Sequence, residues 1–452
     1  MSGNSDAPEI LALPAQKVFL ETLGCQSNVL ESDHIKGLLK KENFILTNNP
    51  DEADVMLFNT CSIRQHAEDK IFSRLGELQA WKKSNHRRRI GVLGCMASSY
   101  KEVLIQRMPH LDMVLGPDQY AKLPALLKGK ALPTVWTDFD PSFFAQNDIE
   151  QWTGSHKAFV EIMKGCDKFC TYCVVPFTRG REISRPWETI REEIQALIDV
   201  GVKEITLLGQ NVNSYGQDMS KDPISFAALL EKIAQLSGLH RLRFMTSHPM
   251  DLSDELIQVM ADYAVICHFL HLPVQSGSDV VLKRMNRKYT IQHYRERVAT
   301  LRKLIPDVAL STDLIVGFPG ETELEFRKTL ELLDEIQYDS VFSFKYSDRE
   351  GTPSARMLDK VTEEIKDQHL KQLNEKAYHY AALKHQARIG QQEEVLIDGP
   401  ADKTPGAWYG KSYHYKTVVF HAPESSRLQA GDFAKVLVQS SKIATLYGTK
   451  VN

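Results

Sequence analysis

Three of the seven cysteines of this chain stand close together in the segment GCDKFCTYCVVP, residues 165–176. Cys166, Cys170 and Cys173 have the spacing CxxxCxxC. A structural zinc site closes with four protein ligands, and no nearby Cys or His completes one at zinc-finger spacing. A cubane iron–sulfur cluster bound by three thiolates leaves one iron with an open coordination position. The spacing therefore favours a [4Fe-4S] cluster with a reactive iron over a structural zinc ion.

Three further cysteines, Cys25, Cys61 and Cys95, each follow a predicted strand in the N-terminal part of the chain. Ligands of parallel sheets bind beyond the carboxyl ends of the strands, so residues far apart in sequence can converge at one edge. Three buried strand-end cysteines without a ligand are the alternative. The seventh, Cys267, lies in the apolar run AVICHFL and is predicted to be a core residue. An odd number of cysteines does not favour a disulfide framework.

The pattern of strands and helices predicts an α/β chain of three domains. From residue 16 to residue 132, short β-rich runs alternate with helical patterns, which is typical of a doubly wound parallel sheet. Turn residues fill a linker at 136–156, and six βα units within 152–383 then predict a partial (βα)6 barrel with functional loops at the carboxyl ends of its strands. Alternating runs broken by Gly, Pro and Asp over 387–450 predict a small antiparallel β-barrel of four or five strands.

Composition narrows the classes of protein and of partner. With 42% hydrophobic and 25% charged residues the chain is ordinary globular protein, and its formal charge of −3 means that a nucleic acid would be held by a local patch. The first fifteen residues hold no Lys or Arg before their short apolar stretch, which argues against a secretory signal. No run of eighteen apolar residues occurs. We therefore predict a cytoplasmic protein without membrane association.

The cysteine loop, with aromatic Tyr172 just before its last cysteine, resembles the CxxxCxφC motif of radical S-adenosylmethionine (SAM) enzymes. The resemblance implies that Cys166, Cys170 and Cys173 hold a [4Fe-4S] cluster whose free iron is chelated by the amino and carboxylate groups of SAM. It also implies that an electron from this cluster cleaves SAM to a 5′-deoxyadenosyl radical. The protein would then exclude water and place a substrate C–H bond next to that radical.

The order of the three domains resembles the methylthiotransferase family along nearly the whole chain, with the last module similar to a TRAM domain. Six separated blocks resemble the MiaB branch of that family: NTCSIRQHAEDK (59–70), CTYCVVPFTRGREISRP (170–186), MTSHP (245–249), HLPVQSGS (271–278), DLIVGFPGET (313–322) and FSFKYSDREGTPSA (342–355). The implied reaction replaces the C2 hydrogen of N6-isopentenyladenosine at tRNA position 37 with a methylthio group. One SAM would supply the methyl group and another the radical. A second [4Fe-4S] cluster, held by Cys25, Cys61 and Cys95, would deliver the sulfur.

Several polar residues are candidates for contacts with SAM or the substrate because they lie at predicted strand ends or in the cysteine loop. They are Tyr172, Gln210, Asn211, Gln275 and Asp313. Hydrogen bonds that only stabilise loops are the alternative for each residue. His268 and His271 are predicted to be satisfied core histidines. Hydrogen at C2 of adenine is not acidic, and no Ser-His-Asp set or carboxylate pair stands at persuasive spacing, so no catalytic side chain is nominated.

The implied partners are the tRNA anticodon stem-loop that carries isopentenyladenosine, an electron donor protein and a sulfur donor, with the enzyme itself acting as a monomer. A base in an anticodon loop can be splayed out and stacked, as proteins usually recognise single-stranded RNA. Five basic residues are candidate phosphate contacts: Arg179, Arg181, Arg185, Lys411 and Lys416. Plain solvated side chains are the alternative for all five.

Two other functions remain open on the sequence. A sister methylthiotransferase would act on threonylcarbamoyladenosine in tRNA or on a ribosomal-protein aspartate. A non-catalytic RNA-binding protein would use the βα units as a scaffold and the cysteines for one structural metal. Metal content separates the non-catalytic RNA-binding protein from a methylthiotransferase, because two cubane clusters require about eight irons per chain.

Overall fold

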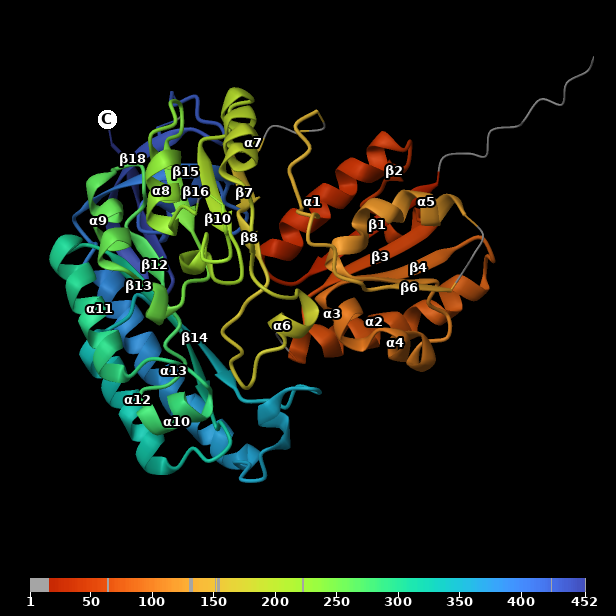
Figure 1. The fold of residues 1–452 in the computed structure, drawn as a ribbon. Coiled ribbons are helices and arrows are strands. Elements are labelled where there is room, and N and C mark those ends of the chain that lie inside the picture. Colours follow the sequence, from red (N-terminus) through yellow and green to blue (C-terminus); the bar gives the residue numbers. More distant parts are fainter. Residues whose placement is uncertain are drawn as a thin grey trace, which may run out of the picture. The chain divides into compact units, whose positions relative to one another are not determined.

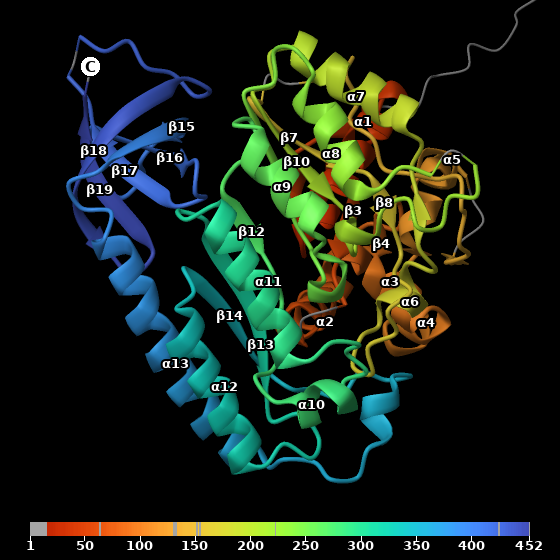
Figure 2. The same cartoon turned by 60° about the vertical axis from the view of Figure 1, so that its left-hand side comes forward.

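The computed structural model describes residues 16–62, 65–129, 133–150, 152, 155–221, 223–423 and 425–451. They form two compact units, Met1–Asp140 and Pro141–Asn452, whose elements are drawn in Figures 1 and 2. The first fifteen residues, on which the prediction of no secretory signal rests, lie outside the described residues. So do Ile63 and Arg64 of the block at 59–70.

The first unit is a parallel sheet with helices on both faces (Figure 1). Its strands are β1 (Lys17–Leu23), β2 (Ile45–Leu46), β3 (Val55–Thr60), β4 (Arg89–Gly94), β5 (Met113–Leu115) and β6 (Thr134–Trp136). They are all parallel, in the order β2-β1-β3-β4-β5-β6. The helices are α1 (Gln26–Lys41), α2 (Gln65–Lys83), α3 (Cys95–Tyr100), α4 (Glu102–Arg107) and α5 (Leu123–Lys128), with 3-10 turns η1 (Pro50–Glu52) and η2 (Pro117–Lys122). Every residue of β3 is buried, as expected of a strand covered on both faces, and the predicted doubly wound sheet is confirmed.

The second unit begins with an open array of parallel strands. They are β7 (Lys157–Glu161), β10 (Glu204–Leu208), β11 (Arg241–Phe244), β12 (Phe269–His271), β13 (Ala309–Val316) and β14 (Ser340–Lys345). Two three-stranded sheets, β11-β10-β7 and β12-β13-β14, meet at a single parallel bridge between Leu242 and Ile266. No pairing of β7 with β14 occurs among the described residues, so the six strands make the partial barrel that the sequence predicts.

Helices follow these strands and cover the outside of the array. The longer ones are α7 (Trp187–Asp199), α8 (Phe226–Ala234), α9 (Asp254–Asp262), α11 (Ile291–Leu304), α12 (Glu323–Ile336) and α13 (Glu363–Gln386). The short elements are β8 (Met163–Lys164), α6 (Val175–Thr178), β9 (Ile183–Ser184), η3 (Val212–Ser214), η4 (Pro249–Asp251), α10 (Asp279–Arg284) and η5 (Pro353–Arg356). In α7, Ile190, Ile194 and Leu197 recur at helical spacing and all three are buried against the sheet.

The C-terminal module is a closed five-stranded barrel, which α13 precedes along the chain (Figure 2). Its strands are β15 (Gln392–Pro400), β16 (Ala407–Ser412), β17 (Thr417–His421), β18 (Phe433–Lys442) and β19 (Thr445–Lys450), joined in the order β15-β16-β17-β19-β18. Pairing is antiparallel except between β17 and β19, which are parallel. The predicted small barrel is confirmed, with one parallel pair in place of a fully antiparallel set.

Two buried arginines of β11 hold this barrel against the partial barrel. The guanidinium of Arg241 donates to the carbonyls of Lys411 at 2.8 Å and Glu394 at 2.7 Å. Arg243 donates to the carbonyls of Ser412 at 2.8 Å and Tyr413 at 3.0 Å. Because each guanidinium bonds backbone carbonyls of the neighbouring module, the contact fixes orientation and leaves few polar groups unsatisfied.

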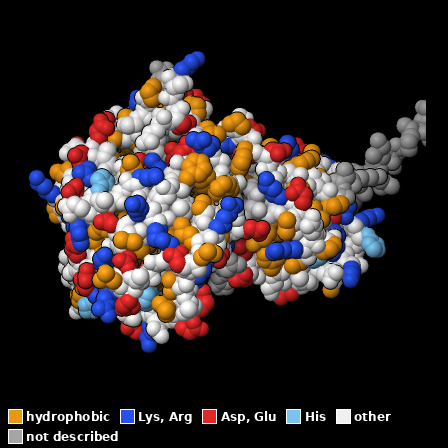
Figure 3. Space-filling view, turned by 60° about the horizontal axis from the view of Figure 1, so that its bottom comes forward, with side chains coloured by type: hydrophobic (Ala, Val, Ile, Leu, Met, Phe, Trp, Pro, Cys, Tyr) orange, Lys and Arg blue, Asp and Glu red, His pale blue; other side chains and the backbone are white. Residues whose placement is uncertain are grey.

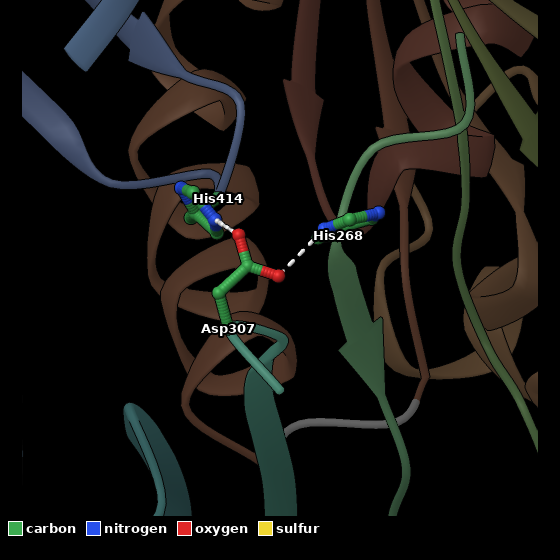
Figure 4. A group of neighbouring side chains, drawn as sticks. All are labelled: His268, Asp307 and His414. Carbon is green, nitrogen blue, oxygen red and sulfur yellow. Dashed lines mark hydrogen bonds and ion pairs between the residues drawn. The ribbon is translucent and has the colours of Figure 1, made fainter. Parts of the chain in front are cut away.

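A cluster of three side chains adds to the same contact (Figure 4). His268 Nδ1 donates to Asp307 Oδ1 at 2.7 Å, and His414 Nε2 of the barrel donates to Asp307 Oδ2 at 2.9 Å. Burial raises the pKa of Asp307, but the hydrogen bonds from the two histidines outweigh it, and the pKa is lowered overall. Nδ1 of His268 and Nε2 of His414 thus both take part in docking the barrel. Cys267, next to this cluster, is 1% exposed, which confirms it as a core residue.

One face of the surface mixes charges of both signs (Figure 3). On the face drawn in Figure 3, Lys and Arg side chains are interspersed with Asp and Glu side chains and do not gather into one basic stripe. On this face a nucleic-acid partner would therefore depend on individual residues more than on the overall field. None of the helices in the described parts of the chain combines the length and apolar character needed to cross a membrane.

Candidate metal centres

The register of the first sheet brings the three strand-end cysteines to one edge. The last residues of three neighbouring strands pair across the sheet: Leu23 of β1, Thr60 of β3 and Gly94 of β4. Cys61 and Cys95 directly follow β3 and β4, and Cys25 lies one residue further beyond the end of β1. Adjacent strands lie about 4.8 Å apart. Parallel pairing alone therefore gathers three thiols that the sequence separates by more than thirty residues each.

A buried network of polar side chains supports this edge. Asn28 Oδ1 accepts hydrogen bonds from the backbone of Cys25 at 3.1 Å and from its Sγ at 3.4 Å. Asn59 Nδ2 donates to the carbonyl of Asn28 at 2.9 Å. Glu31 Oε2 accepts from Asn28 Nδ2 at 3.1 Å and from the hydroxyl of Tyr120 at 3.0 Å. The position of Cys25 thus depends on side chains from three different elements.

The second set of cysteines lies in the loop between β8 and α6 and is held by backbone hydrogen bonds. The amide of Cys166 donates to the carbonyl of Gly180 at 3.2 Å, and that of Thr171 donates to Met285 at 3.0 Å. The amide of Ser354 in turn donates to the carbonyl of Thr171 at 3.0 Å. Three distant segments of the second unit therefore fix a loop that has almost no regular secondary structure.

Two glycines are required next to the cysteines. Gly165, just before Cys166, has a φ of +75°, and a Cβ there would lie 1.9 Å from the carbonyl oxygen of Arg181. Gly94, just before Cys95, has a φ of +86°, and a Cβ would lie 2.7 Å from the carbonyl oxygen of Thr60. Only glycine adopts this backbone at no steric cost. The motif GC at both places thus has a conformational cause.

The chemistry of the loop suits a metal cluster. Burial raises the pKa of the Cys166 and Cys173 thiols to about 12 each, and Cys170 is 9% exposed. Thiolate ligands must be deprotonated, so a metal supplies the positive charge that makes thiolates stable in such a buried place. Three thiols on one loop, with no His or fourth Cys in that loop, match a cubane with one open iron and do not match a closed zinc site.

Two of the predicted strand-end residues are engaged with the loop itself. Gln210 Oε1 accepts a hydrogen bond from the amide of Gly165 at 2.5 Å. Asn211 Nδ2 donates to Asp251 at 2.8 Å, and Asp251 also pairs with Lys168 of the loop at 2.9 Å. Both contacts stabilise the loop. They correspond to the alternative stated for these residues, hydrogen bonds that only stabilise loops. A direct contact of either residue with SAM stays a prediction.

The other three candidates contact residues of β12, of β13 or of the segment that follows β13. The Tyr172 ring packs edge-on against Phe318 with centroids 6.3 Å apart. Gln275 has a φ of +71°, and its amide donates to the carbonyl of Asp313 at 2.9 Å. The Asp313 carboxylate lies 3.5 Å from Nε2 of His271. Gln275, beyond the end of β12, thus lies beside Asp313, which is inside β13, whereas Tyr172 belongs to the cysteine loop. The role of these three residues toward SAM stays a prediction.

Some buried polar atoms after β10 and β11 have no hydrogen-bond partner among the described residues. They are Oδ1 of Asn211, both amide atoms of Asn213 and Oγ of Ser247. Asn213 also lines a cavity of about 460 Å³, together with Tyr215, Gly216 and Asp251 among others. Orphaned buried polar atoms are rare in folded proteins, and a bound polar ligand is one way to satisfy them. This edge of the array therefore fits a polar cofactor.

The five basic candidates for RNA contacts have unequal surroundings. Arg181 is exposed and pairs with Asp167 at 2.5 Å. The guanidinium of Arg185 is 3% exposed and pairs with Glu193, and Lys416 Nζ is bound by Asp339 at 2.6 Å. These two placements do not suit a phosphate contact, because both cations are already neutralised inside the protein.

The remaining two candidates are intermediate cases. Lys411 donates to Thr417 Oγ1 at 2.8 Å, and burial lowers the pKa of its amine. Arg179 is 8% exposed. Of the five, Arg181 is thus the cation most open to solvent, and an RNA role for any of them stays a prediction.

One buried cation near the loop was missed by the sequence reasoning. Arg287 lies after α10 and donates from Nη1 to Cys170 Sγ at 3.5 Å. It stands in the polar stretch RMNRKY, where nothing in the pattern separates a buried arginine from its exposed neighbours. Its role depends on a contact between residues 117 positions apart.

Comparison with known proteins gives three family matches along the chain. Residues 17–116 match the model described as uncharacterized protein family UPF0004, residues 160–333 match the radical SAM superfamily, and residues 386–451 match the TRAM domain. Their order is the order of the three modules described above.

Similar curated proteins span almost the whole chain. The tRNA-2-methylthio-N(6)-dimethylallyladenosine synthase of Clostridium botulinum (strain Langeland) is 42% identical over 438 residues, which cover 96% of each chain. The protein of the same name from Parabacteroides distasonis is 42% identical over 442 residues, again 96% of each chain. That from Protochlamydia amoebophila is 44% identical over 420 residues, covering 91% of this chain and 92% of its own.

Solved structures share the fold at low sequence identity. The radical SAM methyltransferase TsrM from Kitasatospora setae matches with a TM-score of 0.53 and 13% identity, covering 75% of this chain and 77% of its own. The cobalamin-dependent SAM radical enzyme OxsB matches with a TM-score of 0.53 and 14% identity, covering 80% of this chain and 56% of its own. Both likenesses concern the arrangement of the backbone alone.

Proposed function

Because the chain belongs to the radical SAM methylthiotransferases named tRNA-2-methylthio-N(6)-dimethylallyladenosine synthase, we propose which of its residues carry that activity. The enzyme replaces the C2 hydrogen of N6-isopentenyladenosine at tRNA position 37 with a methylthio group. Its cofactors are SAM and [4Fe-4S] clusters. We assign one cluster to Cys166, Cys170 and Cys173, and the other to Cys25, Cys61 and Cys95.

The observation that carries this assignment is the duplication of one chemical arrangement. Each unit gathers three cysteines at the carboxyl edge of its parallel strands or in the loop that follows them, and each set provides three thiolates for a cubane. When bound, the clusters and SAM supply the radical and the sulfur. A structural metal would need one closed site of four ligands, so a non-catalytic scaffold does not account for two sets of three.

The residues of the chain contribute binding, orientation and exclusion of water. The loop that holds Cys170 is fixed by backbone hydrogen bonds to Met285 and Ser354, which would hold a bound cluster in one position. Asn211, Asn213 and Ser247 offer buried polar atoms to SAM or to the substrate base. Gln275 and Asp313 are proposed to line another part of the same site, and Tyr172 to line it from the cysteine loop. Burial around the loop excludes water that would quench a radical.

The substrate partner is tRNA, and the TRAM domain is proposed to hold it. We propose the isopentenylated anticodon stem-loop as the recognised part and Arg181 as the leading phosphate contact. A low-potential electron donor protein and a sulfur donor are required by the chemistry, because the radical step consumes an electron and the product retains a sulfur atom. A tRNA substrate also supports a cytoplasmic place of action, and we propose that one chain acts as a monomer.

Iron and acid-labile sulfide on anaerobically purified protein test the two-cluster assignment. We expect about eight irons per chain in the wild type. The triple variant Cys25→Ala, Cys61→Ala, Cys95→Ala should retain about four. A wild type that starts at about four and does not lose iron in the triple variant would show that the N-terminal cysteines are structural.

Nucleoside analysis of tRNA tests the substrate. Cells that lack the protein should accumulate isopentenyladenosine without the methylthio group, and the wild-type gene should restore the product. An unchanged tRNA profile would reject the substrate. In that case a sister methylthiotransferase acting on another target would become the better description.

A further inference from the structure

The side chain of Arg287 is a buried cation with an unusual set of partners. The residue is 9% exposed. Its guanidinium donates from Nε to the hydroxyl of Tyr289 at 3.0 Å and from Nη2 to the carbonyl of Pro273 at 2.8 Å. The remaining nitrogen, Nη1, donates to Cys170 Sγ at 3.5 Å. All three nitrogens of the planar fork are therefore fixed in the protein interior.

A buried guanidinium requires a negative partner. Taking an unpaired charge out of water is strongly unfavourable even after relaxation, and arginine cannot lose its proton in a protein. No carboxylate pairs with Arg287 among the ion pairs of the described residues. Burial raises the pKa of Tyr289, so its hydroxyl is neutral. Of the three groups that Arg287 bonds, the sulfur of Cys170 is the one that becomes negatively charged when it ligates a metal.

The positive charge of Arg287 acts on its other neighbours as well. His248, 5% exposed, has its pKa lowered to about 2 by burial and by the positive charges of Arg287 and Lys168. The imidazole is therefore neutral at any physiological pH and does not compete as a second cation. Lys168 is already paired with Asp251 at 2.9 Å. Arg287 is therefore the buried cation beside the loop to which no carboxylate of the described residues is paired.

We propose that Arg287 is the counter-ion of the cluster on the cysteine loop and sets its reduction potential. This inference rests on the proposed function in one respect, the assignment of Cys166, Cys170 and Cys173 as cluster ligands. A cubane with three thiolates gains one negative charge when it accepts an electron from the donor. A fixed cation and an N–H donor at a ligand sulfur stabilise that extra charge more than the oxidised form. Arg287 therefore raises the reduction potential of the cluster.

The contact has a functional consequence for the first electron transfer. Hydrogen bonds to the sulfurs, net charge and solvent exposure are the means by which a protein tunes such a cluster. Arg287 supplies the first two, and its burial limits the third. Its planar fork is anchored by Pro273 and Tyr289, so the charge cannot swing away when the loop binds SAM. The residue therefore tunes and positions, and it takes no proton or electron itself.

The test is a potentiometric titration of the loop cluster followed by electron paramagnetic resonance. The background is the full chain with Cys25, Cys61 and Cys95 all changed to Ala, so that only one cluster contributes to the signal. In this background Arg287→Gln should favour the oxidised cluster at least tenfold, a negative shift of about 59 mV for one electron. Arg287→Lys, which keeps the charge, should change the same equilibrium less than threefold.

Arg284→Gln is the matched control. Arg284 lies three residues away, and its guanidinium is paired with Asp359 at 2.6 Å and bonded to the carbonyl of Pro319. The substitution Arg284→Gln removes one positive charge from the same region, and Arg284 makes no side-chain hydrogen bond to a cysteine among the described residues. The potential in this variant should equal that of the background.

Each outcome decides the matter. If the variant with Cys25, Cys61 and Cys95 changed to Ala does not hold about four irons, or gives no reducible signal, the result contradicts the proposed function and not the role of Arg287. With the cluster present, equal potentials in the background and in Arg287→Gln overturn the inference. If Arg287→Gln fails to retain iron, Arg287→Lys decides: a change below threefold supports the counter-ion, and a larger one overturns it.

Discussion

The two sets of three cysteines reach the same chemical arrangement by opposite routes. In the second unit Cys166, Cys170 and Cys173 share one loop that is fixed by backbone hydrogen bonds. In the first unit Cys25 and its partners come from three strands, and a network of buried side chains supports them. Loop ligands depend on local chain geometry, whereas strand-end ligands depend on the register of a whole sheet. Their tolerance to mutation should therefore differ.

The charges beside the two sites differ as well. The loop has the guanidinium of Arg287 at one of its sulfurs. The strand-end site has the buried carboxylate of Glu31, which is bonded to Asn28, and Asn28 in turn is bonded to Cys25. A cation favours a cluster that must accept an electron repeatedly, and a carboxylate does not. The two sites thus have environments suited to different tasks.

The largest effect is expected from removing one ligand at each site. Cys166→Ala should abolish both methylthiolation and cleavage of SAM, because the open iron is lost. Cys95→Ala should abolish methylthiolation but leave cleavage of SAM at the other cluster. Chromatography of 5′-deoxyadenosine and of digested tRNA measures the two activities. The same loss of SAM cleavage in both variants would contradict separate tasks for the two sites.

A second large effect is expected from the glycines that precede the cysteines. A methyl group at Gly165 or Gly94 meets a backbone carbonyl and requires a positive φ, at a cost of about 1–3 kcal/mol in strain alone. Each variant with Ala should lose about four irons, from its own site only. Iron analysis and thermal unfolding follow both changes.

Gly76 of α2 provides the control for these two variants. A Cβ there meets nothing within 4 Å, so Gly76→Ala should raise stability by about 0.5–1 kcal/mol and keep all the iron. Full iron in Gly94→Ala would mean that the backbone next to Cys95 can adopt another conformation.

A smaller effect is expected from the side-chain network of the first unit. Asn59→Ala removes hydrogen bonds to the carbonyl of Asn28 and to Ser32 Oγ in a buried place, at a cost of about 2 kcal/mol. Denaturant unfolding should show this loss, and the strand-end cluster should be more easily removed by chelators. Gln210→Ala at the loop deletes one hydrogen bond to the backbone of Gly165 and should cost less, about 1 kcal/mol. Equal losses would remove the distinction between the two kinds of support.

The smallest effect concerns an exposed charge near the loop. Arg181→Ala should leave the iron unchanged, weaken tRNA binding less than about tenfold and reduce its salt dependence by about one phosphate contact. Arg327→Ala is the control, since Arg327 is similarly exposed and pairs with Glu323 at 3.0 Å. Equal salt dependence in both variants would argue against an RNA contact at Arg181.

The pH dependence of the Arg181 contribution follows from its partner. The hydrogen bond from Arg181 is the main cause that lowers the pKa of Asp167. Stabilisation from this pair is fully present above the ordinary aspartate pKa of about 3.9 and is lost only as the pH falls through the lowered value. Binding measured between about pH 5 and pH 8 should therefore show no change that depends on Asp167.

Much of the fold was predictable because hydrophobic periodicity and turn residues are local properties. The parallel sheet, the six βα units and the terminal barrel all follow the predicted runs. Strand β12 is shorter than the apolar run that predicted it, and β16 stands in GAWYGKS, which has no clear alternation of apolar residues. Both depend on pairing with neighbours, which sequence patterns do not report.

The roles of individual cations were less predictable. Arg185 and Lys416 look like solvated residues in the sequence, but each is buried against a carboxylate from elsewhere in the second unit. Arg241 and Arg243 alternate with apolar residues in β11, and their role in docking the terminal barrel depends on contacts more than 150 positions away. A charge pattern cannot distinguish a solvent-exposed arginine from one whose partners lie in another module.

The sequence was sufficient to nominate the six cysteines as cluster ligands, because thiolate chemistry and the CxxxCxxC spacing depend on residue type and short distances along the chain. It also determined the order of the modules, because each module has its own period of apolar residues. The tertiary structure was needed to show that the register of β1, β3 and β4 brings Cys25, Cys61 and Cys95 to one edge. It alone decided that Arg287 lies against Cys170, since long-range packing places a buried charge and its partner together.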